Sequence, residues 1–407
     1  MEILNWLNPT FIQKVLRKSE QDDSIEVSDI NVKPGTSKGD NYLGDLLRVN
    51  VDFLRSKKHE KIAETTSLIV KVAPRGDFRE DLVRSGKLYD TEISMLSNTL
   101  PRMENTHVGV GTISLAPRYI YSQIEVPIHL IMEDLKLKGL RIADRHAGLD
   151  LEHCLVAIRK LAVFHASSIA LRDKDPQALM RYERGLCHES QPASLVAFVN
   201  GCAEALGKQV VKWPELNPRI REKLVKLSSV FYEKGSESTR FEQDDFNVLN
   251  HGDFWVNNMM FRYDERKKPV DAIFVDFQLS KHGSPAIDLL YFFGTSPSDD
   301  VRIHHRDLLL REYYASLTAT MADLKCSTEA PGFDKLQEAL RKRAFYEVIA
   351  SFVILPLVLV EVEVQKGLDE IIKPDGTHEN PGFESKIFRK VMTRVLPLFD
   401  SMGLLDV

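Results

Sequence analysis

The stretch NVLNHGDFWVNNMMF, from Asn247 to Phe261, places a cluster of polar side chains directly between two apolar runs. Val248 and Leu249 precede the cluster, and an apolar run from Met259 follows it, so both flanks favour short buried strands. Polar side chains enclosed in this way must find hydrogen-bond partners or serve a ligand. The stretch therefore predicts an ordered polar loop between two core strands, which constrains any fold that the chain adopts.

The spacing within this loop is typical of phosphoryl transfer. Asp253 and Asn258 are five positions apart, and Asp276 ends the apolar run DAIFVD further along the chain. Transfer from ATP to a hydroxyl requires a carboxylate beside the attacking oxygen, together with an amide and a second carboxylate as oxygen ligands for Mg²⁺. We therefore predict Asp253 as the catalytic residue, and Asn258 and Asp276 as the metal ligands. The alternative is a loop whose Asp and Asn side chains only cap turns.

Residues suited to nucleotide binding precede this loop. Lys71 lies inside the strand-like run TSLIVKVAP, where its ammonium group needs a partner, and Glu92 on the following helical segment is a candidate. An edge strand with a snorkelling lysine is the plain alternative. The loop PGTSKGDNYLGDLLRV offers backbone N–H groups for phosphate contacts at Gly39, Asp40 and Asn41. It departs from the G-x-G-x-x-G pattern, however, and also suits an ordinary hairpin turn.

Further positions complete the predicted site. The backbone of Glu133 and Leu135, in the segment HLIMEDL, is a candidate to hydrogen-bond adenine, unless the segment is a plain connection. Asp288 begins an apolar helix, and we predict that Asp288 and His251 support the catalytic loop structurally. His165 is left out of the catalytic set, because a histidine on an amphipathic helix is more often a satisfied core residue.

The order of β-like and helical patterns predicts the fold class. Short alternating or β-branched runs occupy Ser24 to Leu135, interrupted by one helix-like piece over residues 82–100, and helical periodicity dominates afterwards. A chain of 407 residues also favours two lobes with a cleft. We predict an α+β, two-lobe protein. Residues 1–135 form a small β-rich nucleotide-binding lobe with a leading helix, and residues 136–407 form a helical lobe with the catalytic loop and acceptor site.

Charge and cysteine content argue against several other classes. The 54 basic and 59 acidic residues give a net charge of -5 without a long Lys/Arg run, so we expect no nucleic-acid partner. The four cysteines are widely spaced, which is typical of reduced thiols in a cytoplasmic protein. The N-terminus lacks a signal-peptide pattern, and the apolar stretch from Ala344 is interrupted by Glu347, Pro356 and Glu361. We expect a soluble, cytoplasmic protein without membrane association.

Several motifs together resemble the insect ecdysteroid kinase-like family, which belongs to the choline kinase and aminoglycoside phosphotransferase group. They are NHGDFWVNNMMF and VDFQ, preceded by KGDNY, VKVAP, LYDTEISML and MEDL. The resemblance extends over nearly the whole chain. It implies a protein-kinase-like fold, the cofactors ATP and Mg²⁺, and transfer of the γ-phosphoryl group to a hydroxyl of a small molecule such as an ecdysteroid. It implies the same roles for Asp253, Asn258, Asp276, Lys71 and Glu92 as those given above.

Two departures from the wider group bear on the site. Gln278 stands where that group often has an acidic residue, which leaves open whether one or two Mg²⁺ ions bind. Phe254 and Trp255 stand where Leu and His are common, which makes the acceptor site more apolar, and Trp255 is our candidate acceptor-site residue.

Two questions have alternative answers: which acceptor is phosphorylated, and whether the protein is an enzyme or a binding protein. We expect a hydroxylated apolar acceptor, such as an ecdysteroid or a xenobiotic in detoxification. Choline, ethanolamine and aminoglycosides are the rival acceptors, but the sequence reveals no acidic or aromatic cage for a cation. A kinase-like binding protein without turnover is the other class, although a scaffold has no chemical need for all five residues of the predicted set.

Overall fold

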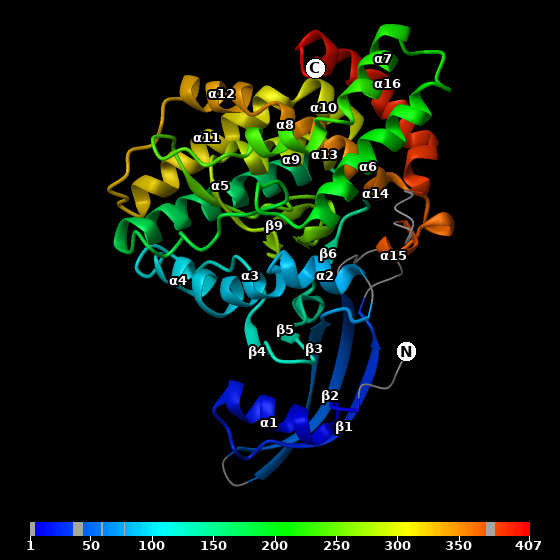
Figure 1. Cartoon of the computed structure of the whole chain (residues 1–407). Coiled ribbons are helices and arrows are strands. Elements are labelled where there is room, and N and C mark those ends of the chain that lie inside the picture. Colours follow the sequence, from blue (N-terminus) through cyan, green and yellow to red (C-terminus); the bar gives the residue numbers. More distant parts are fainter. Residues whose placement is uncertain (1–4, 36–43, 58–59, 77, 372–378) are drawn as a thin grey trace.

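The structure is a computed structural model that describes residues 5–35, 44–57, 60–76, 78–371 and 379–407. A β-rich sheet from the N-terminal part of the chain lies at one end of the molecule, and helices make up most of the other end (Figure 1). The predicted α+β class, with a small β-rich part followed by a larger helical part, is confirmed.

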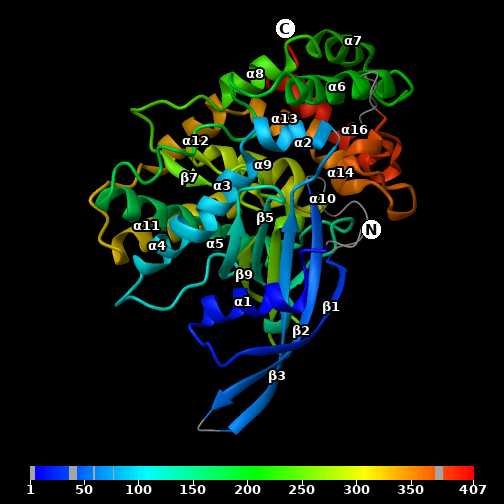
Figure 2. The same ribbon diagram turned by 60° about the horizontal axis from the view of Figure 1, so that its bottom comes forward.

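The N-terminal sheet is antiparallel and five-stranded, in the order β1-β2-β3-β5-β4. Because β3 lies between β2 and β5 and residues 67–72 are buried, Lys71 lies on a central strand and the edge-strand alternative is wrong. The hairpin of β2 and β3 extends beyond the rest of the sheet in Figure 2. The strands are β1 (Glu26–Pro34), β2 (Asp45–Lys57), β3 (Glu60–Val72), β4 (Tyr119–Gln123) and β5 (His129–Glu133).

Helix α1 (Pro9–Glu20) covers one face of this sheet (Figure 1). The Oδ1 atom of Asn8 caps the helix by accepting a hydrogen bond from the backbone N–H of Phe11 at 3.0 Å, and Pro9 occupies the first turn. The buried residues of α1 recur at helical spacing and pack in one cluster with the strands; they are Ile12, Val15 and Leu16.

Between β3 and β4 the chain forms several short helices instead of the single helix predicted over residues 82–100. They are α2 (Phe78–Ser85), α3 (Leu88–Ser94), the π-helical turn η1 (Met95–Thr99) and α4 (Leu100–Asn105). The break between α2 and α3 falls at Lys87, whose φ of 56° is left-handed and cannot continue a right-handed helix. This break lets α3 take its own direction, with Glu92 buried against β3.

Helix α5 (Leu151–Lys174) is the central helix of the C-terminal part and packs against α11 (Arg306–Asp323) and β9 (Pro269–Phe274). Among the described helices it alone is long and apolar enough to cross a membrane, but 78% of its apolar window is buried inside the protein, as in a core helix. The apolar stretch from Ala344 forms two buried helices, α13 (Phe345–Val353) and α14 (Leu355–Leu359), with Pro356 in the first turn of α14.

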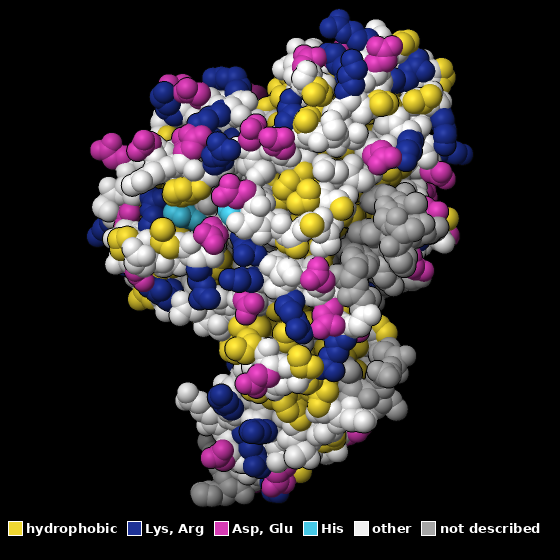
Figure 3. All heavy atoms as spheres, viewed as in Figure 1, with side chains coloured by type: hydrophobic (Ala, Val, Ile, Leu, Met, Phe, Trp, Pro, Cys, Tyr) yellow, Lys and Arg dark blue, Asp and Glu magenta, His cyan; other side chains and the backbone are white. Residues whose placement is uncertain are grey.

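The other helices surround this core (Figure 1). On the face shown in Figure 3, acidic and basic side chains are interspersed. All four cysteines are free thiols. The helices and helical turns are η2 (Leu135–Lys138), α6 (Ala193–Val210), α7 (Pro218–Leu227), α8 (Phe231–Ser238), α9 (Ala286–Thr295), α10 (Asp299–His304), α12 (Phe333–Lys342), η4 (Val362–Val364), α15 (Leu368–Ile371), η5 (Pro381–Glu384) and α16 (Lys386–Ser401).

Two small sheets position the polar loop. β7 (Val248–Asn250) pairs with β10 (Lys281–Gly283), and β8 (Met259–Tyr263) lies between β6 (Arg141–Ile142) and β9. The loop 251–258 joins β7 to β8 and ends in the 3₁₀ turn η3 (Val256–Asn258). Since β8 and β9 are paired, and the N–H of Val275 donates to the carbonyl of Asn258 at 3.0 Å, Asn258 and Asp276 come to the same end of this sheet.

Candidate active site

Asp288, in the first turn of α9, holds the start of the loop 251–258 through its backbone. Its Oδ2 accepts a hydrogen bond from the N–H of His251 at 2.7 Å, and its Oδ1 accepts one from the N–H of Gly252 at 2.8 Å. The Nε2 atom of His165 lies 3.1 Å from the same Oδ2, and Nδ1 of His165 lies 2.7 Å from the hydroxyl of Tyr313. All of these groups are buried and satisfied, so Asp288 anchors the loop and His165 is a hydrogen-bonded core histidine.

Gly252 and His251 fix the shape of the turn before Asp253. Gly252 has a φ of 83°, and a Cβ atom on it would lie 1.8 Å from the carbonyl oxygen of Leu279, so only glycine fits. The Nε2 atom of His251 lies 3.0 Å from the carbonyl of Val275, and its Nδ1 accepts from the N–H of Asp253 at 3.3 Å. A carbonyl on one side and an N–H on the other require a neutral ring protonated at Nε2, and burial lowers the pKa of His251 accordingly.

Asp253 is held from two sides. Its Oδ2 accepts from Nδ2 of Asn258 at 2.8 Å, and its Oδ1 accepts from the hydroxyl of Tyr291. Burial and the nearby charge of Asp276 raise the pKa of Asp253 to about 6, although these two hydrogen bonds favour the ionised form. The carboxylate is thus mostly ionised at neutral pH and retains enough basicity to accept a proton.

Tyr291 is a site residue that the sequence reasoning missed. It is completely buried on α9, three residues after Asp288, so that the two side chains lie on the same face of the helix. Asp288 binds the start of the loop and Tyr291 binds the side chain of Asp253. The spacing D-L-L-Y in the first turns of the apolar helix, with Tyr291 three residues after the predicted support residue Asp288, was the signal that could have identified it.

Lys71 forms a buried cluster with two carboxylates. Its Nζ lies 2.8 Å from Oε2 of Glu92 and 2.9 Å from Oδ1 of Asp276, and the side chains of Lys71 and Glu92 are only 2% and 1% exposed. Burial opposes the charge of Lys71, but Asp276 and Glu92 outweigh it and raise the pKa of the lysine. Burial raises the pKa of Glu92, with a further contribution from Asp276. The cluster therefore brings the predicted lysine, its predicted partner and one predicted metal ligand together.

Gln278 and the backbone of Asp276 complete this cluster. The amide of Gln278 is oriented so that both its nitrogen and its oxygen are hydrogen-bonded. The nitrogen donates to Oδ1 of Asp276 and the oxygen accepts from Nζ of Lys71, each at 3.3 Å. An acidic residue at this position would place a third carboxylate against a single ammonium group, whereas the neutral amide bridges the pair. Asp276 itself has a φ of 66°, an unfavourable backbone conformation for a residue with a side chain, as is often found at functional sites.

A cavity of about 430 Å³ opens beside the cluster, between the N-terminal sheet and β8. Its lining includes the polar side chains of Lys71, Glu92, Asn258 and Asp276 and the segment from Glu133 to Leu135. Apolar residues, among them Ile69, Met132 and Met260, also line it. The predicted positions Gly39, Asp40 and Asn41 lie outside the described residues.

The side chain of Asp134 holds the segment from Glu133 to Leu135 against the N-terminal sheet. Its Oδ2 accepts from Nε of Arg48 at 2.6 Å and from the hydroxyl of Ser67 at 2.8 Å, while its Oδ1 caps η2 by accepting from the N–H of Lys136 at 3.1 Å. These bonds lower the pKa of Asp134 against the effect of burial. The carboxylate ties the segment to β2 and β3, a contact that the sequence reasoning did not identify.

A second cavity, of about 100 Å³, lies on the other side of the loop and is almost entirely apolar. Trp255 and Asp253 line it, and Trp255 is 6% exposed, whereas Phe254 is completely buried and packs 4.9 Å from the ring of Phe274. The indole N–H of Trp255 makes no hydrogen bond with any described residue. The other lining residues are Leu82, Gly86, Leu88, Leu186, Leu195, Phe198, Leu279, Val353, Ile354 and Leu357.

The donor set suits a metal ion that also binds phosphate oxygens. No group of three or more His, Cys, Asp or Glu side chains within the described residues is arranged to hold a metal alone. In this part of the chain, Nδ2 of Asn258 is used by Asp253, and only Oδ1 of Asp276 is used by Lys71. One oxygen of each side chain therefore remains for a hard cation, and Mg²⁺ usually takes one or two protein oxygens together with phosphates and water.

A comparison with models of protein families identifies the family of the chain. A model of the ecdysteroid kinase-like family matches residues 38–326, which include strands β2 to β5 of the N-terminal sheet, the loop 251–258 and Asp276. No curated protein matches significantly. Among solved structures, the gentamicin-APH(2")-IIa complex, of an aminoglycoside phosphotransferase, is similar at 16% identity and a TM-score of 0.33, covering 84% of this chain and 97% of that chain. Because the family model matches well over half of the sequence, the chain belongs to the ecdysteroid kinase-like family and has a small-molecule kinase-like function.

Proposed function

We propose that the protein is an ATP- and Mg²⁺-dependent kinase that transfers the γ-phosphoryl group to a hydroxyl of an ecdysteroid or a similar hydroxylated apolar compound, including xenobiotics. One observation carries the proposal. Asn258 lines the polar cavity, Asp253 lines the apolar cavity, and the two side chains are hydrogen-bonded at 2.8 Å. A nucleotide in the first cavity and an acceptor in the second would therefore meet at this pair.

Each side chain has a separate task in the proposed reaction. Asp253 receives the proton of the acceptor hydroxyl, while Tyr291 and Asn258 keep its carboxylate oriented. Lys71 binds phosphate oxygens, and Glu92 keeps its ammonium group in place. Asn258 and Asp276 would hold Mg²⁺, which supplies neutralisation of the phosphate charge when bound. Residues 1–135 contribute most of the nucleotide site. Residues 136–407 contribute the catalytic loop and most of the acceptor site, whose lining also includes Leu82, Gly86 and Leu88 from the N-terminal part.

The lining of the second cavity favours an apolar acceptor. Besides Asp253 and the indole of Trp255, its side chains are hydrocarbon, and Gly86 has none. Burying apolar surface there stabilises a complex by about 25 cal/mol per Å², whereas a quaternary amine or a polycationic sugar would lose hydration without gaining further carboxylates. Since the cavity measures about 100 Å³, it holds the hydroxyl-bearing end of a steroid-sized molecule, with the remainder outside it.

An acceptor panel tests this choice. The purified protein is incubated with MgATP and, separately, a hydroxylated steroid, choline, ethanolamine and an aminoglycoside. We expect kcat/KM for the steroid to exceed that for each cationic acceptor by about 10-fold or more, since a few buried methylene groups contribute that much. A preference for choline or the aminoglycoside would overturn the assignment of the acceptor, while leaving the kinase assignment intact.

The ion pair of Lys71 and Glu92 gives a graded prediction. Lys71→Met should lower kcat/KM for ATP by roughly 10²-fold, as is typical when a preorganised donor to a charged group is lost. Glu92→Gln should have a smaller effect, because Asp276 still holds the ammonium group at 2.9 Å. Steady-state kinetics with varied ATP measure both. Lys61→Met, an exposed lysine on the same strand that pairs with Glu26, is the matched control and should behave like the wild type. Wild-type values in both site variants would make the pair purely structural.

Variants of Trp255 test whether this side chain lines the acceptor site or only supports the loop 251–258. If it lines the acceptor site, Trp255→Ala should raise KM for a steroid-like acceptor about 10-fold or more and leave KM for ATP nearly unchanged. If it only braces the loop, the same change should lower the melting temperature and impair both substrates. Trp255→Phe keeps most of the ring and removes the N–H, so it separates packing from hydrogen bonding. An unchanged acceptor KM in a well-folded Trp255→Ala variant would exclude this residue from the acceptor site.

A further inference from the structure

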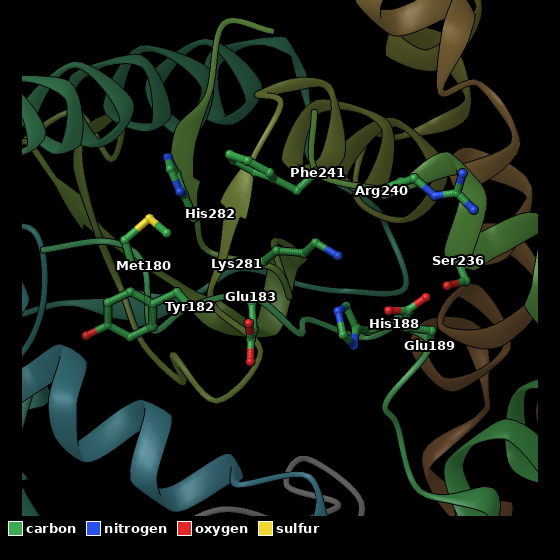
Figure 4. A pocket seen from close by; sticks show the side chains of 10 residues that line it. All are labelled: Met180, Tyr182, Glu183, His188, Glu189, Ser236, Arg240, Phe241, Lys281 and His282. Carbon is green, nitrogen blue, oxygen red and sulfur yellow. The ribbon is translucent and has the colours of Figure 1, made fainter. Parts of the chain in front are cut away.

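A third cavity, of about 320 Å³, is lined by none of the site residues described above (Figure 4). It is lined by the segments 180–189, 236–241 and 281–282. It shares no lining residue with the apolar cavity, since Leu186 lines the apolar cavity whereas Glu183 and His188 line the third one. The third cavity is therefore a separate space and not an extension of the acceptor site.

A buried lysine forms the inner end of this cavity. Lys281 is 2% exposed, and Figure 4 shows its side chain extending into the space between Arg240, Ser236 and His188. Its Nζ donates only to neutral acceptors: the carbonyls of Arg184 at 3.2 Å and Cys187 at 3.3 Å, and the hydroxyl of Thr239 at 3.5 Å. No carboxylate among the described residues forms an ion pair with it. A buried ammonium group held by long bonds to neutral groups is incompletely compensated.

The electrostatics of the surroundings strengthen this conclusion. Burial lowers the pKa of Lys281 to about 8, and the positive charge of Arg343 adds to the effect. The lysine is still mostly protonated at neutral pH, so a positive charge persists at the inner end. The acidic residues Glu183 and Glu189 and the basic Arg240 are exposed at the rim, and the charge of Glu183 partly opposes the lowering of the pKa of Lys281. Because water and salt screen the exposed rim charges while the ammonium group is buried, the inner end of the cavity favours an anionic group.

The backbone is shaped to keep the lysine in this position. Gly185 has a φ of 65°, and a Cβ atom on it would lie 2.9 Å from Cδ of Lys281. The segment around Gly185 thus packs closely against the lysine stem, and a residue with a side chain there would displace it. A lysine at the surface would normally extend its ammonium group into water.

The rings of His282 and Phe241 also line the cavity, and both can still contact a ligand. His282 is 8% exposed, and its Nε2 has no hydrogen-bond partner among the described residues. Burial, with Arg172 nearby, lowers the pKa of His282 to about 4, so the ring is neutral. Its centroid lies 5.2 Å from that of Phe241, whose side chain is 44% exposed. A flat ligand can therefore cover Phe241 while a polar group reaches the inner end.

We propose that this cavity binds a small aromatic carboxylate, with the carboxylate facing Lys281 and the ring against Phe241. A carboxylate supplies the charge-assisted hydrogen bonds that the neutral carbonyls do not supply. The site is connected to the catalytic loop, because Lys281 pairs with Asn250 across β7 and β10, and Asn250 directly precedes His251. Nδ2 of Asn250 also donates to the carbonyl of Lys281 at 3.2 Å.

Calorimetric titration of the full-length protein with benzoate tests the proposal, with the neutral isostere benzamide as the matched ligand. We expect benzoate to bind at least about 10-fold more tightly than benzamide, a difference in the range of charge-assisted hydrogen bonds. Lys281→Met should abolish this preference, and Glu189→Gln at the rim should leave it within about 2-fold. Equal affinity for the two ligands, absence of benzoate binding, or an unchanged preference in Lys281→Met would overturn the proposal.

Phe241→Ala provides a second variant that does not depend on the buried lysine. Because Phe241 is largely exposed, its removal should leave the melting temperature nearly unchanged. We expect this variant to bind benzoate at least about 5-fold more weakly, through loss of ring contact. Unchanged benzoate affinity in Phe241→Ala would contradict the proposed pose even if Lys281→Met fails to fold.

Discussion

Replacing Asp253 with asparagine is expected to lower kcat by about 10²-fold or more while ATP still binds, because a positioned general base contributes about 10²- to 10⁴-fold. The amide has nearly the same shape, and its oxygen can still accept the hydrogen bond from Tyr291, but it cannot take a proton at neutral pH. The effect should therefore appear in kcat and not in nucleotide affinity, which steady-state kinetics and a calorimetric ATP titration measure separately.

Asp244→Asn is the matched control for this change, because Asp244 is an exposed aspartate shortly before the loop 251–258. We expect it to retain wild-type kcat. Full activity in Asp253→Asn would remove the assignment of Asp253 as the base. A loss of both kcat and ATP binding, together with a lower melting temperature, would instead indicate that the carboxylate only holds the loop together.

Replacing Asp276 with alanine is expected to abolish measurable turnover, with a loss of roughly 10³-fold or more, since a metal ion contributes several kcal/mol of charge stabilisation. The change removes a proposed Mg²⁺ ligand and one of the two carboxylates that hold Lys71. Nucleotide binding should also lose its dependence on Mg²⁺. Calorimetric titrations of ATP with and without EDTA measure that dependence directly.

Asp276→Asn separates the two roles of this residue. The asparagine keeps an oxygen for the metal but loses the negative charge next to Lys71, so we expect an activity between those of the wild type and Asp276→Ala. If nucleotide affinity and turnover are insensitive to EDTA in the wild type, or if Asp276→Ala retains Mg²⁺-dependent binding, the proposed metal site is wrong.

The parts of this architecture that local patterns determine could be predicted from the sequence. The strands of the N-terminal sheet followed from alternating and β-branched runs, and the polar loop followed from its apolar flanks. The proximity of Lys71 to Glu92 was also predictable, because a buried ammonium group inside a strand requires a partner and Glu92 lies on the next helical segment. In each case, one physical requirement is expressed within a short stretch.

Contacts between distant segments could not be predicted in this way. Asp134 binds Arg48 and Ser67 across three strands, and no local pattern distinguishes that arrangement from a carboxylate facing the nucleotide cavity. Which of Phe254 and Trp255 faces the second cavity depends on the turn after Asp253, because neither helical nor strand periodicity applies there. The third cavity depends on the fold of segments nearly a hundred residues apart, and the sequence alone gave no sign of it.

The most direct test of the account is transfer of the labelled γ-phosphoryl group of ATP to a hydroxylated steroid, with the phosphorylated product identified by mass spectrometry. We predict that the wild-type protein forms a product carrying one phosphate on a hydroxyl, that EDTA prevents its formation, and that Asp253→Asn forms it at no more than about a hundredth of the wild-type rate. Binding of MgATP without transfer to any hydroxylated compound, or transfer that is unaffected by the loss of Asp253, would contradict the account.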